Sequence, residues 1–245
     1  LPLGNGYETI IFVAWCLSLL ALGIGRRFPI AAPSGLLMSG FALLVASLGM
    51  ANPQITPLVP VLRSPWLSLH VSLIMVSYAL LGLLMLNGTA ALALAAAARA
   101  GTAERTSRTL ARLRLFGRLL LYPAVFLLTA GIFTGAVWAN ASWGRYWGWD
   151  PKEVWALITL IVYALPLHEQ SLARFRRPLF FHAYTLWAFA AVLMTYFGVN
   201  YLLGGMHSYG GGFRPGYAAA TVFAAVTAFA LLTVAALIRQ RRTDT

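Results

Sequence analysis

The chain has 245 residues, of which 60% are hydrophobic and only 10% are charged. Together with a mean hydropathy of +0.76, these fractions exclude a water-soluble globular domain. They predict an all-α, polytopic membrane helix bundle in which residues 1–245 form a single transmembrane domain. The formal charge of +12 does not indicate a nucleic-acid partner, because no basic block carries interleaved aromatic residues or a nucleic-acid-binding fold signature.

Seven apolar runs follow one another along the chain, each near the length of about 20 residues that spans a bilayer. They lie at residues 8–25, 33–51, 69–98, 118–139, 153–169, 179–203 and 217–238. We therefore expect about seven transmembrane helices. The second run has the weakest signal, because Pro33 opens it and glycines interrupt it.

The start of the chain contains the single cysteine and a first residue other than Met. The single cysteine, Cys16, lies in the first apolar run, where we expect a small buried hydrophobic residue rather than a disulfide or a metal ligand. The sequence begins with Leu1 rather than with Met, so we expect further residues before it and an even number of spans in the complete protein.

The basic residues predict the orientation of the bundle. They fall into blocks on alternate sides of the spans: Arg26 and Arg27, Arg99 through Arg118, Arg174 through Arg177, and Arg239 through Arg242. The positive-inside rule places these blocks and the C-terminus in the cytoplasm, and the N-terminus outside. The connections at 51–69, 138–155 and 204–216 are then extracytoplasmic. The connection expected at 99–118 would contact anionic headgroups, which makes membrane lipids a partner.

The extracytoplasmic segment 138–155, "WANASWGRYWGWDPKEVW", holds five of the eight tryptophans. Its end is typical of a helix start, because Asp150 suits the N-cap, Pro151 the first helical position and Glu153 a capping box. An aromatic belt at the headgroup level accounts for one or two of the tryptophans. Five of them, spaced by Gly144 and Gly148, also fit a surface for a large flat ligand.

Two histidines flank this segment on the same side of the membrane. His70 falls at the outer mouth of the third span, and His207 follows the outer end of the sixth. Imidazoles are common axial ligands of haem iron, whose porphyrin needs aromatic walls and whose propionates need cations such as Arg145 and Lys152. Each histidine can instead be a hydrogen-bonded structural residue, and the pattern of residues leaves both interpretations open.

The other two histidines lie toward the cytoplasmic side. His168 ends the fifth apolar run close to the basic block at Arg174, and it is either a ligand or a polar residue that reaches the headgroups. His182, four residues after Pro178, is predicted to be an interfacial residue without a partner.

The stretch "WANASWGRYWGWDPKEVWALITLIVYALPLH" resembles the Trp-rich WWD signature of haem-handling proteins in cytochrome c biogenesis, specifically the CcsA type, also called ResC. Further matches follow in the same order as in that family: "PLGNGYETIIFVAW", "LHVSLIMVSYALL" at His70, "YALPLH" at His168 and "VNYLLGGMHSYG" at His207. The resemblance covers nearly the whole chain.

The resemblance implies a role for each of these residues. His70 and His207 would ligate haem b, as substrate and ligand, on the outer face, and His168 would hold haem in transit from the cytoplasmic side. A CcsB/ResB-type partner would supply the second histidine at His168. The implied haem platform consists of Trp138, Trp143, Arg145, Tyr146, Trp147, Trp149, Asp150, Lys152 and Trp155.

The implied activity is that of a cytochrome c haem lyase, or synthase, subunit. It would present haem to the Cys-x-x-Cys-His segment of apocytochrome c, in a bacterial plasma membrane or a thylakoid membrane. Asp150 and Glu153 are expected to cap a helix and not to act as catalytic acid or base. Two alternatives stay open: a haem-b electron-transfer subunit, which would place histidine pairs at matched depth on neighbouring helices, and a haem exporter without ligation activity.

Overall fold

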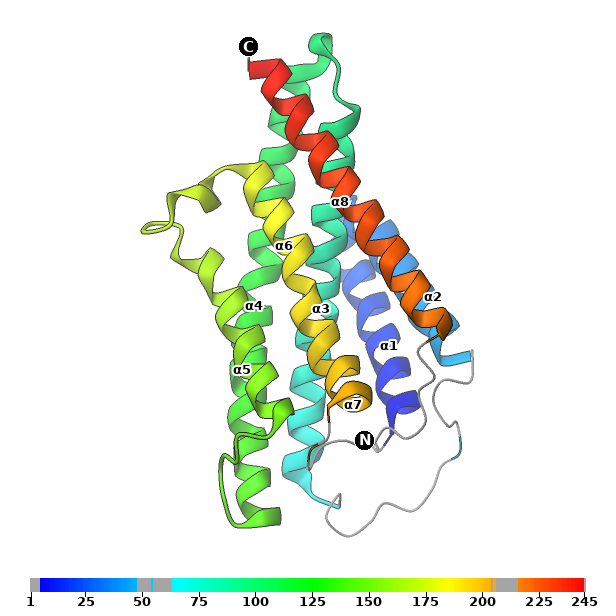
Figure 1. Ribbon diagram of the computed structural model, residues 1–245, viewed down its shortest axis with the longest axis vertical. Coiled ribbons are helices and arrows are strands. Elements are labelled where there is room, and N and C mark those ends of the chain that lie inside the picture. Colours follow the sequence, from blue (N-terminus) through cyan, green and yellow to red (C-terminus); the bar gives the residue numbers. More distant parts are fainter. Residues whose placement is uncertain (1–4, 48–53, 55–62, 204, 206–215, 245) are drawn as a thin grey trace.

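The computed structural model describes residues 5–47, 54, 63–203, 205 and 216–244. Every regular element in those ranges is helical, and the long helices run side by side (Figure 1). Five of the described helices are long and apolar enough to cross a membrane. The predicted all-α membrane helix bundle is therefore confirmed.

The described α-helices cover the seven predicted spans, and α6 and α7 together correspond to the sixth. They are α1 (Gly6–Gly25), α2 (Ala31–Ser47), α3 (Pro65–Ala97), α4 (Ala103–Trp143), α5 (Pro151–Ala164), α6 (Pro178–Leu193), α7 (Val199–Leu202) and α8 (Gly216–Asp244). A 3-10 turn, η3 (Leu165–His168), extends α5 where Pro166 interrupts the regular helix. A π-helical turn, η5 (Met194–Gly198), joins α6 to α7. The second helix has only 17 residues, in agreement with its weak signal.

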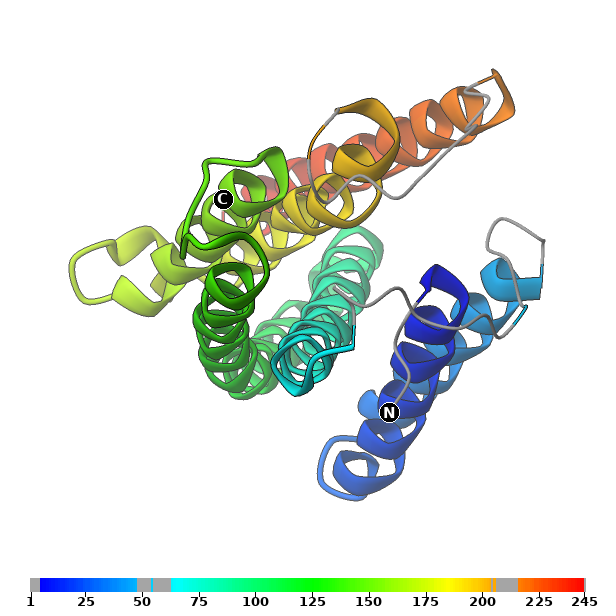
Figure 2. The same ribbon diagram turned by 90° about the horizontal axis from the view of Figure 1, so that it is seen from below.

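The antiparallel pair α3 and α4 forms the centre of the bundle, and α3 also contacts α1, α2, α6 and α8 (Figure 2). Small residues on α4 allow this close packing: a Cβ added at Gly131 would lie 2.6 Å from the Ile74 side chain. Pro123 interrupts the hydrogen bonding of α4, and beside it Ser77 donates to the Ala124 carbonyl at 2.8 Å. Cys16 is buried against this core, as expected.

The structure corrects the expectation of a loop at 99–118. From Ala103 onward this stretch is the first part of α4, which has 41 residues and is therefore about 60 Å long. Thr106, Leu110, Leu113 and Gly117 recur at helical spacing and face the bundle, while Arg105, Arg108 and Arg112 are exposed. Hydropathy alone misread this stretch, because an amphipathic helix rich in arginine scores like a polar loop.

The two ends of the bundle carry different segments (Figure 1). The connection from α4 to α5, the start of α3 and the end of α7 lie at one end. The connection from α3 to α4 and the C-terminus lie at the other, where Arg239 on α8 donates to the Ala98 carbonyl. This segregation agrees with the predicted topology; which end faces the cytoplasm stays a prediction.

Candidate functional site

The Trp-rich segment begins inside α4. Trp138, which is almost completely buried, and the half-buried Trp143 lie one and a half turns apart, with ring centroids 4.8 Å apart in an edge-to-face arrangement. Gly144 ends the helix with a left-handed φ of 73°, and its N–H donates to the Asn140 carbonyl at 2.9 Å. The segment thus consists of the end of a helix followed by a short connection.

Glu153 fixes the backbone of this connection. The predicted capping box is present: Asp150 accepts from the Lys152 N–H at 3.0 Å, and Glu153 Oε2 accepts from the Asp150 N–H at 3.2 Å. The same Oε2 also accepts from the Gly148 N–H at 2.7 Å. Sequence reasoning missed this third bond because it assigned Glu153 to the cap alone.

Trp149 lies between these two N–H groups in an unfavourable backbone conformation. Its φ of 56° is the only positive φ of a non-glycine residue in the described ranges. Such a conformation persists where surrounding contacts stabilise it, and Glu153 provides two of them. The Trp149 side chain is 71% exposed, and its ring meets that of Trp147 edge to face at 5.9 Å. Tyr146 is also exposed.

Residues at the start of α5 contact α7 and the chain that follows it. Lys152 Nζ donates to Asn200 Oδ1 on α7 at 2.9 Å. Lys152 precedes the apolar run of α5, and its burial lowers its pKa to about 8, although the nearby Asp150 carboxylate opposes that shift. A Cβ added at Gly205 would lie 2.6 Å from Asp150 Oδ1. The chain therefore passes against Asp150 two residues before His207, which itself lies outside the described residues.

The remaining platform residues differ in exposure. Arg145 is exposed in the connection, where a Cβ added at Gly148 would lie 2.8 Å from its Nε. Trp155 is half-buried on α5, one turn after Pro151. The structure thus places one tryptophan pair at the end of α4, a second pair in the connection and Trp155 on the helix that follows.

His70 lies in a groove between two glycines of α4. Its Nδ1 is 2.6 Å from the Gly131 carbonyl, and a Cβ added at Gly135 would lie 2.6 Å from the same nitrogen. Since a carbonyl only accepts, Nδ1 carries a proton, and in the neutral imidazole the lone pair is then on Nε2. Metal-binding histidines commonly have such an outer hydrogen bond, which fixes the tautomer and the ring orientation.

His168 shows the same tautomer in a different setting. It is exposed on the 3-10 turn η3, and its Nδ1 donates to the Ala164 carbonyl at 3.0 Å. The next residue, Glu169, forms ion pairs with Arg114 and Arg118 of α4, the latter at 2.8 Å. The 14 residues of α5 separate this turn from the Trp-rich connection by about 20 Å.

The structure corrects the prediction for His182, which is fully buried instead of interfacial. Its Nε2 donates to the Leu110 carbonyl of α4 at 3.3 Å, so it also has a partner. The early turns of α4, which the sequence had suggested to be a loop, cover this position. Within the described ranges, no cluster of three or more His, Cys, Asp or Glu side chains could hold a metal ion.

Similarity to known proteins identifies the family of this chain. The family model described as cytochrome C assembly protein matches residues 3–207. Protein NrfI of Wolinella succinogenes is 41% identical over 211 residues, which cover 86% of this chain but only 23% of that protein. The cytochrome c biogenesis protein CcsA of Chlamydomonas reinhardtii is 37% identical over 220 residues, 85% of this chain and 61% of that protein.

A third relative is covered more completely. The CcsA protein of Synechococcus sp. strain WH7803 is 36% identical in an alignment that covers 85% of this chain and 77% of that protein. The match to the family model and the identity to these relatives extend over most of the chain. The chain therefore belongs to the cytochrome c assembly family, as a cytochrome c biogenesis protein of the CcsA type.

Proposed function

We propose that this membrane protein binds haem b, as its substrate, at the Trp-rich end of the bundle and presents it for covalent attachment to apocytochrome c. The observation that carries this proposal is the geometry of His70. Its Nδ1–H bond to Gly131 orients the ring, and in the neutral imidazole it selects the tautomer with the lone pair on Nε2, the form in which an imidazole binds iron. Trp138 lies one turn beyond Gly135 on the same face of α4.

His207 is the proposed second axial ligand. Support comes from Gly205, which lies against Asp150 at the start of α5. Two residues of extended chain span at most about 7 Å, so this contact is consistent with an imidazole near the Trp-rich connection. Two neutral imidazoles would hold the iron from both faces, set its potential and exclude oxygen from it.

The Trp-rich connection would supply apolar walls for the porphyrin and cations for its propionates. The exposed ring of Trp149 and its neighbour Trp147 offer apolar surface for a porphyrin. Lys152 and Arg145 would pair with the propionates. The lowered pKa of Lys152 supports this role, because a buried ammonium is stabilised by an additional anion.

The chain's chemical contribution is orientation. Each cysteine thiol of a Cys-x-x-Cys-His segment adds across one haem vinyl group, the sulfur to one carbon and the hydrogen to the other, so no net oxidation occurs. Fixing the vinyl groups against the thiols raises their effective concentration by orders of magnitude. The histidine of the apocytochrome would then replace one of the two protein imidazoles. We propose this haem lyase activity for the chain together with a CcsB/ResB-type partner.

A second haem position is proposed at His168, nearer the other end of the bundle. The exposure of this side chain and its Nδ1–H bond to Ala164 are consistent with a ligand that a histidine of the partner completes. Haem would pass from this position outward to the Trp-rich end. The arginine-rich end would face the cytoplasm, with the C-terminus, in a bacterial plasma membrane or a thylakoid membrane.

The test is co-expression of the full chain with its partner and a Cys-x-x-Cys-His reporter, followed by measurement of covalently attached haem. We expect His70→Gly and His207→Gly to lower haem content at the outer site, and added imidazole to restore maturation partly by filling the vacated coordination position. Normal haem spectra and normal maturation in the double variant would refute the assignment. An exporter or an electron-transfer subunit would attach no haem to the reporter.

His168→Ala provides the test of the second position. The chain alone should hold haem at the outer site only, and addition of the partner should create a second bis-histidine signal. That second signal should disappear in His168→Ala while the outer signal survives. Retention of both signals and of full maturation would remove the basis for a relay.

A further inference from the structure

One face of α4 carries a continuous stripe of exposed apolar side chains. Leu115, Leu119, Phe126 and Phe133 are 55%, 48%, 71% and 69% exposed, and their spacing of four or seven residues places them on one side of the helix. From Leu115 to Phe133 the stripe spans 18 helical rises, or about 27 Å, close to the hydrocarbon thickness of a bilayer. This stripe therefore marks the part of α4 that faces acyl chains.

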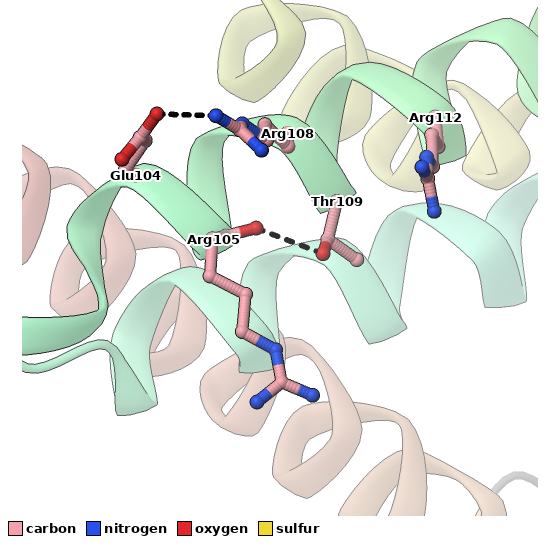
Figure 3. Close-up of a pocket in the computed structure, with 5 residues that line it drawn as sticks. All are labelled: Glu104, Arg105, Arg108, Thr109 and Arg112. Carbon is pink, nitrogen blue, oxygen red and sulfur yellow. Dashed lines mark hydrogen bonds and ion pairs between the residues drawn. The ribbon is translucent and has the colours of Figure 1, made fainter.

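The same face continues into a basic groove. Arg112 comes three residues before Leu115, one turn beyond the end of the apolar stripe and thus at the level of lipid headgroups. The groove is lined by Glu104, Arg105, Arg108, Thr109 and Arg112 (Figure 3). Figure 3 shows Arg105 and Arg112 extending from the same side of the helix, with Thr109 between them.

The acidic groups nearby leave this groove with uncompensated charge. Glu104 forms its ion pair with Arg108, and Glu169 forms its pairs with Arg114 and Arg118. In the part of the chain that the structure describes, Arg105 and Arg112 form no ion pair. Two guanidinium groups on adjacent sides of a hydroxyl are suited to a phosphate, which accepts charge-assisted hydrogen bonds from arginine.

We infer that this groove binds the phosphate of an anionic phospholipid, whose acyl chains lie along Leu115, Leu119 and Phe126. The continuity of the basic groove with the apolar stripe favours a lipid over a soluble anion, because only a lipid contacts both. Arg105, further from the stripe, would reach back toward the headgroup with its long side chain. This inference rests on α4 alone and is independent of haem chemistry.

The experiment uses the full chain in detergent and measures bound lipid by native mass spectrometry at increasing phosphatidylglycerol. Each basic residue near an anionic surface contributes to the binding free energy. We therefore expect the loss of one groove arginine to weaken phosphatidylglycerol binding about fivefold, and the loss of both to weaken it roughly 25-fold. Arg105→Gln with Arg112→Gln is compared with Arg26→Gln and Arg27→Gln, which remove the same charge from an exposed turn in another part of the bundle. The control variant should bind like wild type.

Further arms identify the source of the phosphate. Phosphatidylcholine should bind weakly to all variants, and neither glycerol 3-phosphate nor inorganic phosphate should displace phosphatidylglycerol. Equal weakening in both double variants, equal binding of phosphatidylcholine, or displacement by free phosphate would overturn the inference. If the double variant aggregates, Arg112→Gln alone, eluting as wild type from size exclusion, must still show the fivefold loss.

Discussion

The two ends of the bundle present a histidine with the same tautomer but hold it by different means. At the Trp-rich end, His70 lies between Gly131 and Gly135 of a neighbouring helix, so its orientation depends on the packing of α3 against α4. At the arginine-rich end, His168 bonds to the carbonyl of its own preceding turn and stays exposed. The orientation of His70 is therefore determined by packing within this chain. The exposed His168 is accessible to a ligand that a second protein also contacts.

The polar interactions at the two ends differ in the same way. The Trp-rich connection is ordered by hydrogen bonds from backbone N–H groups to Glu153. The turn that follows His168 is tied to α4 by ion pairs of Glu169. The two histidine positions should therefore respond to different substitutions.

The largest effect concerns the side of the membrane that each end faces. In a Cys16→Ala background, cysteines at positions 145 and 108 should react with an impermeant thiol reagent from opposite sides, because the positive-inside rule separates the two ends. Labelling is measured on intact cells and on inverted vesicles. Reaction of both positions from the same side would show that the two ends do not face opposite sides of the membrane.

Gly135→Ala should disrupt the Trp-rich end selectively. The added Cβ would lie 2.6 Å from His70 Nδ1, so the imidazole must move and lose its bond to Gly131. Overpacking of this kind costs about 1–3 kcal/mol, and we expect outer haem affinity to fall at least about tenfold in a haem titration. Gly23→Ala is the matched control, since a Cβ there meets no atom within 4 Å. Equal haem affinity in the two variants would show that the groove does not orient His70.

Glu169→Gln should weaken the other end. It removes a carboxylate whose side chain is 18% exposed and leaves Arg114 and Arg118 without their anion, at a cost of about 1–3 kcal/mol in unfolding free energy. Glu104→Gln breaks a largely exposed pair with Arg108 and should cost less than about 0.5 kcal/mol. Thermal unfolding in detergent separates the two. A cost for Glu104→Gln as large as that for Glu169→Gln would contradict the structure.

Glu153→Ala should act mainly on the local arrangement of the tryptophans. It removes two accepted hydrogen bonds, each worth about 1 kcal/mol net, and so releases the positive φ of Trp149. Tryptophan fluorescence should shift, and outer haem content should fall. Glu153→Gln keeps an acceptor oxygen and should retain most of the wild-type spectrum; a Gln variant as impaired as the Ala variant would indicate a role for the charge instead.

The sequence was informative wherever the signal is local. Apolar runs predicted the spans, and the order Asp150, Pro151, Glu153 predicted the helix start that is observed. The bond from Gly148 to Glu153 could not be predicted, because it depends on the left-handed conformation at Trp149.

Features that depend on how the helices pack against one another could not be predicted from the sequence. The contact of His70 with Gly131 requires the register of α3 against α4, although two glycines four residues apart were a usable signal for close helix packing. The burial of His182 was missed for a related reason, since it follows from the helical form of the early turns of α4.

Pro123 gives α4 a mechanical property that a regular helix lacks. Because proline provides no N–H, the helix is weakened at one point, and that point lies between the arginines that hold the His168 turn and the glycines that hold His70. The arm from Pro123 to Trp143 is about 30 Å long, so a bend of about 5° would displace its tip by roughly 3 Å. A small angular movement at Pro123 would thereby be magnified at the Trp-rich end, without requiring the arm that carries the arginines to move.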